Sequence, residues 1–137
     1  MLVHSLGHVV LKVRDLRRSE AFYADVLGMP IIDHISEPVR MTFFTLGNHH
    51  DFAIIETSND APIPDAASPG LAHVAFKIGD SPDELDAVRV ELEAAGIAIQ
   101  YEAKRAYTTS FHMLDPDDNE VELYIDTSDV WTTPIPA

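Results

Sequence analysis

A strand-like segment that occurs twice constrains the fold of this chain more than any other feature. Residues 5–15 read SLGHVVLKVRD and residues 70–80 read GLAHVAFKIGD. Each copy has a histidine, His8 or His73, at the start of an apolar run that ends in a lysine and an aspartate. The two histidines are separated by about half of the 137-residue chain. Self-similarity on this scale indicates one folding unit that is present twice.

A helix-like segment follows each copy of the repeat. In the first, Asp15 is a candidate N-cap and Gly28 is placed to end the helix. In the second, Ser81 and Glu84 have the spacing of a capping box, and Gly96 is placed to end the helix. The apolar positions that can share a helical face are Leu16, Phe22, Tyr23, Val26 and Leu27 in the first segment, and Leu85, Val88 and Leu92 in the second.

Three strand-like segments then follow each helix. They read PIIDHIS, RMTFFTLG and DFAIIET in the first half, and IAIQYEA, TSFHML and NEVELYID in the second. We therefore expect an α+β fold of two βαβββ modules that form one curved, half-barrel sheet with the helices outside. The expected single domain covers 1–137. Its parts are module one at about 4–57, a linker at 58–69, module two at about 70–126, and a C-terminal tail at 127–137 that Trp131 anchors.

Composition narrows the range of functions. The formal charge of −14 disfavours nucleic acid and anionic membranes as partners. The absence of cysteine excludes disulfides and thiolate metal sites. No apolar run approaches the roughly 20 residues of a membrane span. We expect a soluble, cytoplasmic protein, with a homodimer as the default assembly.

The duplicated histidines suggest a metal site. A two-fold relation between the modules would make His8 and His73 face each other, and facing neutral imidazoles are half of such a site. The missing ligand would be a carboxylate. NEVELYID offers Glu120, Glu122 and Asp126 on one face, although that face could instead be solvated. Two histidines and one carboxylate leave coordination positions open, which favours Fe(II), with Mn(II) as a second option.

The pattern GHVVLKVRDLRRSEAFYADVLGM near the start and DPDDNEVELY near the end resemble the vicinal oxygen chelate superfamily. This superfamily includes glyoxalase I, extradiol dioxygenases, methylmalonyl-CoA epimerase, and the fosfomycin and bleomycin resistance proteins. The resemblance covers residues 4–126. It implies that His8, His73 and Glu122 are the metal ligands.

Within the superfamily, the closest resemblance is to the catalytic domain of extradiol dioxygenases. NHHDFAI resembles their His-His-x-x-Ala segment, which implies that His50 is the catalytic acid–base group and that His49 lies beside the substrate. Arg105 and His112 stand where these enzymes usually have a histidine and a tyrosine. We expect both to contact substrate, Arg105 through an anionic substituent and His112 as a hydrogen-bond donor. The predicted function is ring cleavage of a catecholic aromatic with O2.

Two alternatives stay open. The first is a glyoxalase- or epimerase-like lyase or isomerase that uses Zn(II), Ni(II), Co(II) or Mn(II), with Glu56 as a fourth ligand and base. The fourth ligand depends on strand register, because a slip of one residue reverses the direction of a side chain. The second is a non-catalytic drug-binding resistance protein. The predicted metal site could form within one chain or across a dimer.

Overall fold

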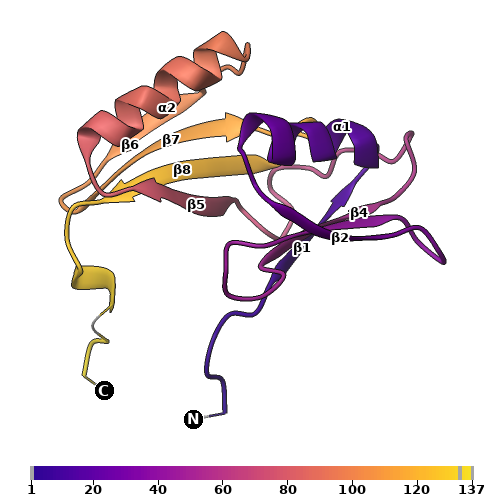
Figure 1. Cartoon of the computed structure of the whole chain (residues 1–137), viewed down its shortest axis with the longest axis horizontal. Coiled ribbons are helices and arrows are strands. Elements are labelled where there is room, and N and C mark those ends of the chain that lie inside the picture. Colours follow the sequence, from indigo (N-terminus) through magenta and orange to yellow (C-terminus); the bar gives the residue numbers. More distant parts are fainter. Residues whose placement is uncertain (1, 133, 137) are drawn as a thin grey trace. The chain divides into compact units, whose positions relative to one another are not determined.

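The computed structural model describes residues 2–132 and 134–136. The chain divides into two compact units, unit 1 at Met1–Ala66 and unit 2 at Ala67–Ala137. Each unit contains an open four-stranded sheet with a helical segment after its first strand (Figure 1). The predicted α+β fold and the two βαβββ modules are therefore confirmed, while the joint half-barrel stays a prediction. Within the described residues, every helix is too short or too polar to cross a membrane.

Unit 1 has the strand order β1-β4-β3-β2, in which β1 and β4 are parallel and the other neighbours are antiparallel. Its elements are β1 (Val9–Val13), α1 (Leu16–Glu20), η1 (Ala21–Val26), β2 (Ile31–Ile35), β3 (Met41–Phe44) and β4 (Phe52–Glu56). The first strand in sequence, β1, is thus hydrogen-bonded to the last, β4, and the edges of the sheet are β1 and β2.

The helical segment of unit 1 begins and ends where the sequence predicts. The side chain of Asp15 accepts a hydrogen bond from the backbone N–H of Arg18 at 3.0 Å, and Gly28 has a φ of 72°. A finding that the pattern did not predict is that α1 continues as the π-helical turn η1. This wider turn coincides with two adjacent buried aromatics, Phe22 and Tyr23. The Tyr23 ring packs against Phe52 of β4, with ring centroids 4.7 Å apart.

Unit 2 repeats this topology with the order β5-β8-β7-β6, and β5 is parallel to β8. Its elements are β5 (Val74–Gly79), α2 (Pro82–Ala94), β6 (Tyr101–Lys104), β7 (Thr108–Leu114), β8 (Glu120–Asp126) and the short η2 (Val130–Thr132). The predicted capping box is present: Ser81 and Glu84 exchange side-chain-to-backbone hydrogen bonds. Gly96 ends the helix with a φ of 73°.

Each sheet packs one face against its own helix. On β8 the buried residues Val121, Leu123 and Ile125 alternate with half-buried polar ones. On β4, Phe52 and Ile54 are buried, and Phe52 contacts the helical segment. The sheet face turned away from the helix is called the far face below. On β8 the far face carries the polar side chains, because the other face is filled by the core.

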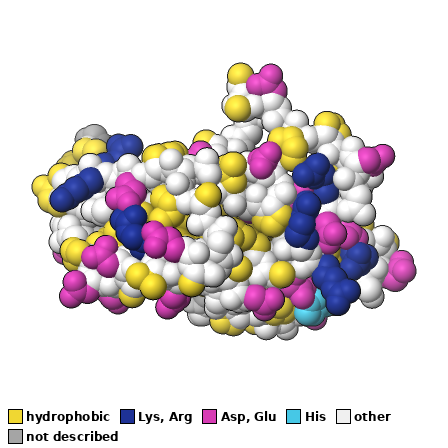
Figure 2. Space-filling view, turned by 90° about the horizontal axis from the view of Figure 1, so that it is seen from above, with side chains coloured by type: hydrophobic (Ala, Val, Ile, Leu, Met, Phe, Trp, Pro, Cys, Tyr) yellow, Lys and Arg dark blue, Asp and Glu magenta, His cyan; other side chains and the backbone are white. Residues whose placement is uncertain are grey.

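The acidic residues do not gather into one patch on the face seen in Figure 2, where Asp and Glu are interspersed with Lys and Arg. The C-terminal segment is attached to unit 2 as predicted, because the indole N–H of Trp131 donates to Thr108 Oγ1 at 3.0 Å.

Candidate functional site

Three histidines of unit 1 lie side by side where β1 begins. His8 immediately precedes β1, and His49 and His50 belong to the loop between β3 and β4. The ring centroids of His8 and His50 are 4.5 Å apart, and those of His49 and His50 are 3.9 Å apart. One ring nitrogen of each lies within 4.8 Å of the others, a spacing at which this group could itself bind a cation. The structure therefore brings the predicted ligand His8 next to the predicted acid–base group His50.

One carboxylate, that of Asp51, organises the loop that carries these histidines. Asp51 Oδ2 accepts a hydrogen bond from the backbone N–H of Leu46 at 2.6 Å and lies 3.4 Å from the backbone nitrogen of His49. The Leu46 bond is the main cause that lowers the pKa of Asp51 to about 2. The carboxylate is thus ionised at neutral pH, and it fixes the backbone from which His50 projects.

His50 is half-buried in a partly aromatic setting. The ring of Phe43 on β3 meets it edge-on, with centroids 5.2 Å apart. Burial, followed by the neighbouring His49 and His8, lowers the pKa of His50 against an opposing effect of Asp51. Its imidazole is therefore mostly neutral at pH 7, and a neutral imidazole can accept a proton through one ring nitrogen.

Unit 2 brings two of the predicted ligands into contact. Ala75 on β5 is the register partner of Glu122 on β8, and His73 lies two residues before Ala75, on the same face. His73 Nε2 is 3.1 Å from Glu122 Oε2. Two atoms bound to one ion at about 2.0–2.2 Å lie about 3 Å apart, so this pair fits half of a metal site. The side chain of Glu122 is only 16% exposed, and a cation would offset the cost of burying its charge.

His112 connects Glu122 to a second acid. His112 lies opposite Glu122 in the β7–β8 register, and its Nε2 is 3.7 Å from Glu122 Oε1. On the other side of the ring, Nδ1 is 2.7 Å from Glu120 Oε1. An ionised carboxylate only accepts hydrogen bonds, so Nδ1 is the donor in this contact. The His112 side chain is 7% exposed, and its Nε2 also lies 3.3 Å from the hydroxyl oxygen of Ser110.

Glu120, one of the candidate carboxylates on NEVELYID, contacts Tyr101, a residue with no predicted role. The Tyr101 hydroxyl donates to Glu120, and its ring stacks on His112 with centroids 4.2 Å apart and planes 12° apart. This hydrogen bond raises the pKa of Tyr101 to about 12 and is the main cause that lowers the pKa of Glu120. Alternation along the strand predicts that Glu120 shares a face with Glu122, but it does not predict the contacts of Glu120 with Tyr101 and His112. Tyr101 gave no local signal, because only the β6–β7 pairing brings it opposite His112.

Glu56, the fourth ligand of the lyase alternative, is engaged elsewhere. Its carboxylate accepts two hydrogen bonds from Arg40 Nη1, at 2.9 and 2.7 Å, and one from the backbone N–H of Leu16 at 3.0 Å. Leu16 is the first residue of α1, so Glu56 lies on the helix side of the sheet. Arg105, expected to bind an anionic substituent, is exposed in the turn between β6 and β7.

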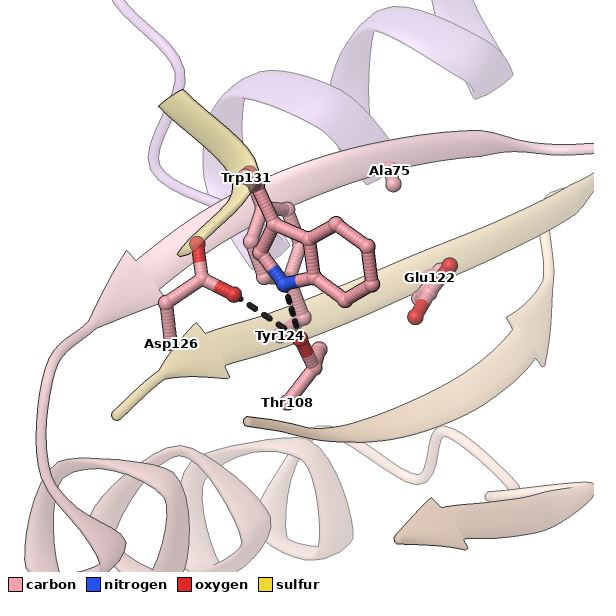
Figure 3. A pocket seen from close by; sticks show the side chains of 6 residues that line it. All are labelled: Ala75, Thr108, Glu122, Tyr124, Asp126 and Trp131. Atoms are coloured by element: carbon pink, nitrogen blue, oxygen red, sulfur yellow. Dashed lines mark hydrogen bonds between the residues drawn. The ribbon is translucent and has the colours of Figure 1, made fainter. Parts of the chain in front are cut away.

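A pocket of about 280 Å³ lies on the far face of unit 2 (Figure 3). The residues that line it are Ala75, Thr108, Glu122, Tyr124, Asp126 and Trp131. In the view of Figure 3 the indole of Trp131 lies between Asp126 and Glu122. The pocket therefore has a predicted metal ligand at one end and the anchored C-terminal segment at the other.

Curated relatives of the chain include ring-cleaving dioxygenases. The chain is 33% identical to biphenyl-2,3-diol 1,2-dioxygenase 3 of Rhodococcus globerulus over 88% of its own length and 63% of the relative's. It is 28% identical to catechol-2,3-dioxygenase of Bacillus subtilis, over 88% of the chain and 41% of that enzyme. The chain thus spans less than two thirds of these relatives. A glutathione transferase, FosA of Serratia marcescens, is 26% identical over 90% of the chain and 82% of the relative.

Solved structures agree with the fold. A glyoxylase/bleomycin resistance protein/dioxygenase domain from Frankia sp. matches with a TM-score of 0.76 at 22% identity, over 90% of this chain and 98% of that one. The model of the Glyoxalase/Bleomycin resistance protein/Dioxygenase superfamily matches residues 5–123. This match confirms the resemblance inferred from the two sequence patterns: the chain belongs to the Glyoxalase/Bleomycin resistance protein/Dioxygenase superfamily.

Proposed function

We propose that the chain is a metal-dependent, extradiol-type ring-cleaving dioxygenase that acts on a catecholic aromatic with O2. The main support is a difference between β4 and β8. Ala53 pairs with Val10 on β1 as Glu122 pairs with Ala75 on β5, so an alanine stands where a fourth ligand would be needed. A set of two histidines and one carboxylate then remains, and such a set leaves coordination positions open for substrate and O2.

The residues proposed to hold the metal are His8, His73 and Glu122. The contact between His73 and Glu122 supports this assignment for unit 2. Imidazole and carboxylate ligands suit Fe(II), with Mn(II) as a second option. When bound, such an ion would supply the redox chemistry by which a catechol reacts with O2.

His50 is proposed to take a proton from a catechol hydroxyl and return it later in the reaction. Imidazole suits both transfers because it titrates near neutrality. The position of His50 beside His8 supports this role. His49, which contacts both rings, is proposed to border the substrate. His112, which lies beside Glu122, is proposed to face the substrate, and a substrate contact of Arg105 stays a prediction.

The lyase or isomerase alternative needs Glu56 near the metal. Its two hydrogen bonds from Arg40 and its bond to Leu16 would have to break before the carboxylate could turn toward the far face. Breaking them would leave the arginine and the helix N-terminus without this acceptor, at a cost of about 1–3 kcal/mol. This engagement is a second reason to place ring cleavage before the lyase or isomerase reaction.

The test is anaerobic reconstitution with Fe(II), followed by air and a panel of substituted catechols. We expect stoichiometric iron and a yellow ring-fission product. His50→Gln should keep its iron and lower turnover by about 100-fold or more. The matched control His4→Gln, in the exposed N-terminal segment, should behave like the unmodified chain. Normal iron binding without product from any catechol would overturn the proposal, as would failure to bind iron.

A further inference from the structure

The pocket of unit 2 extends beyond the groups that ring cleavage itself requires. Glu122 stands at one end, whereas Thr108, Asp126 and Trp131 form the other. Ring opening requires a metal, two adjacent oxygens on the substrate and an acid–base group, none of which accounts for this second end. The residues at this second end therefore bear on a different question: which substituent the substrate has at the end opposite its two reacting oxygens.

The second end is built by register. Glu122, Tyr124 and Asp126 alternate along β8 and so share the far face. Thr108 on β7 is the register partner of Asp126, and its hydroxyl donates to Asp126 Oδ1 at 2.9 Å. Trp131 donates to the same hydroxyl oxygen at 3.0 Å. The one hydroxyl proton of Thr108 is thus already directed at Asp126, so this end of the pocket presents an acceptor to a ligand.

The charge of the pocket is negative. Its lining includes the carboxylates of Glu122 and Asp126 and contains neither lysine nor arginine. Lys77, on the same face of β5 as Ala75, interacts electrostatically with Asp126 and Tyr124, but its ammonium pairs with Asp80 at 2.5 Å. With Lys77 and Asp80 offsetting each other, Glu122 and Asp126 leave the surroundings of the pocket negative. A carboxylate accepts about four hydrogen bonds, and Thr108 supplies one of them. A substrate with a distal carboxylate or phosphonate would be repelled here, whereas a cation would be attracted.

The aromatic walls favour the same kind of group. The indole of Trp131 and the phenol of Tyr124 both line the space next to Asp126. An ammonium group beside these rings gains cation–π attraction in addition to its charge pairing. The volume of about 280 Å³ lies at the lower limit of ligand pockets, which hold drug-sized molecules at roughly 300–1,000 Å³. Such a space suits one aromatic ring with a short side chain.

We propose that this pocket selects a single-ring aromatic whose distal substituent is a protonated amine bound by Asp126 and Trp131. The assignment of a catechol to the reacting end of such a substrate rests on the proposed ring cleavage. The assignment of an amine to its other end rests on the residues of the pocket alone. The two parts can therefore be tested separately.

Trp131 is the one tryptophan of the chain, so its fluorescence reports on the pocket directly. The full chain without added metal is titrated with 2-phenylethylamine and with phenylacetate, which share a ring and differ in charge. We expect the amine to bind at least about tenfold more tightly than the acid, because charge-assisted hydrogen bonds favour it. Asp126→Asn should abolish most of this preference. The control Asp86→Asn, which removes one negative charge from an exposed position on α2, should retain it.

Equal binding of the two probes, or a preference that Asp126→Asn leaves unchanged, would overturn the inference. The iron-loaded chain then gives a second readout with 4-(2-aminoethyl)catechol and (3,4-dihydroxyphenyl)acetate. If neither is cleaved while the amine preference persists, the proposed function fails and the pocket assignment stands. If both are cleaved with equal kcat/KM, ring cleavage stands and the selectivity fails.

Discussion

The two units share one fold and differ on the far face of their sheets. By register, Ala53 is the counterpart of Glu122, because they pair with Val10 and Ala75 on the equivalent first strands. Phe43 pairs with Ala53 as His112 pairs with Glu122, which makes Phe43 the counterpart of His112. An apolar pair in unit 1 thus corresponds to an ionisable pair in unit 2.

The residues that face the helices did not diverge in this way. Phe52 and Val121 are counterparts, and both are buried. Packing against a helix requires an apolar residue in either unit, whereas the far face carries no such requirement. The preceding residues, Asp51 and Glu120, are both acids with lowered pKa values, but Asp51 binds loop backbone while Glu120 binds Tyr101 and His112. The acid at this position thus holds loop backbone in unit 1, whereas in unit 2 it binds two side chains.

The largest effect is expected from making β8 resemble β4. Glu122→Ala puts an alanine where unit 1 has Ala53 and removes the one carboxylate of the predicted metal site. We expect Fe(II) affinity to fall by at least about 100-fold, since even the neighbours of ligands are worth 10- to 100-fold. Competition with a chelator under anaerobic conditions measures the loss.

Glu56→Ala is the matched change in unit 1. It removes the acceptor of Arg40 and of the Leu16 N–H, so it should lower the free energy of unfolding by about 1–3 kcal/mol and leave Fe(II) affinity intact. Urea unfolding measures the first quantity. If both variants lose metal equally, the assigned difference between β4 and β8 is wrong, and Glu56 regains its place as a candidate ligand.

His112→Phe extends the same comparison, because it copies Phe43. It removes the ring that lies between Glu120 and Glu122. We expect Fe(II) affinity to fall by about 10- to 100-fold with little change in Tm. Tyr101→Phe, which removes only the hydroxyl bound to Glu120, should cause a smaller loss. A fall in Tm with unchanged metal affinity would show that His112 serves packing alone.

The sequence predicted the helix-facing half of each unit well, because caps and apolar alternation are local signals. The cap at Asp15 and the capping box at Ser81 and Glu84 are both present as expected. The π-helical turn η1 was not foreseen, since it coincides with the packing of Tyr23 against Phe52 of β4, a contact between segments far apart in sequence. The direction of Glu56 was left open for a similar reason: strand register is set by pairing with other strands and not by the strand's own residues.

Asp51 offers a pH-dependent test of the loop in unit 1. Its pKa is about 2 in the folded chain and 3.8 ordinarily, so its contribution to stability is fully present above about pH 4 and is lost as pH falls through 2. We expect Asp51→Asn to lower Tm at pH 5, and we expect the difference from the unmodified chain to shrink as pH falls from 4 through 2. Scanning calorimetry across this range measures the difference. A difference in Tm that stays constant on acidification would contradict the role of the charge.

The smallest effect is expected at the start of α2, where unit 2 has a capping box and unit 1 has a single cap. A methyl group at Gly79 would approach the carboxyl carbon of Glu84 to 2.6 Å, so Gly79→Ala should displace Glu84 and open the box. We expect a loss of about 1 kcal/mol, the usual worth of a cap, because the helix N-terminus loses its acceptor. Hydrogen exchange should show faster opening of the first turn of α2 and unchanged rates in α1. Gly70→Ala is the matched control, since a methyl group there would meet no atom within 4 Å. If Gly79→Ala is as stable as Gly70→Ala, then Glu84 adjusts to the added methyl group without loss of the cap, and the expected effect is wrong.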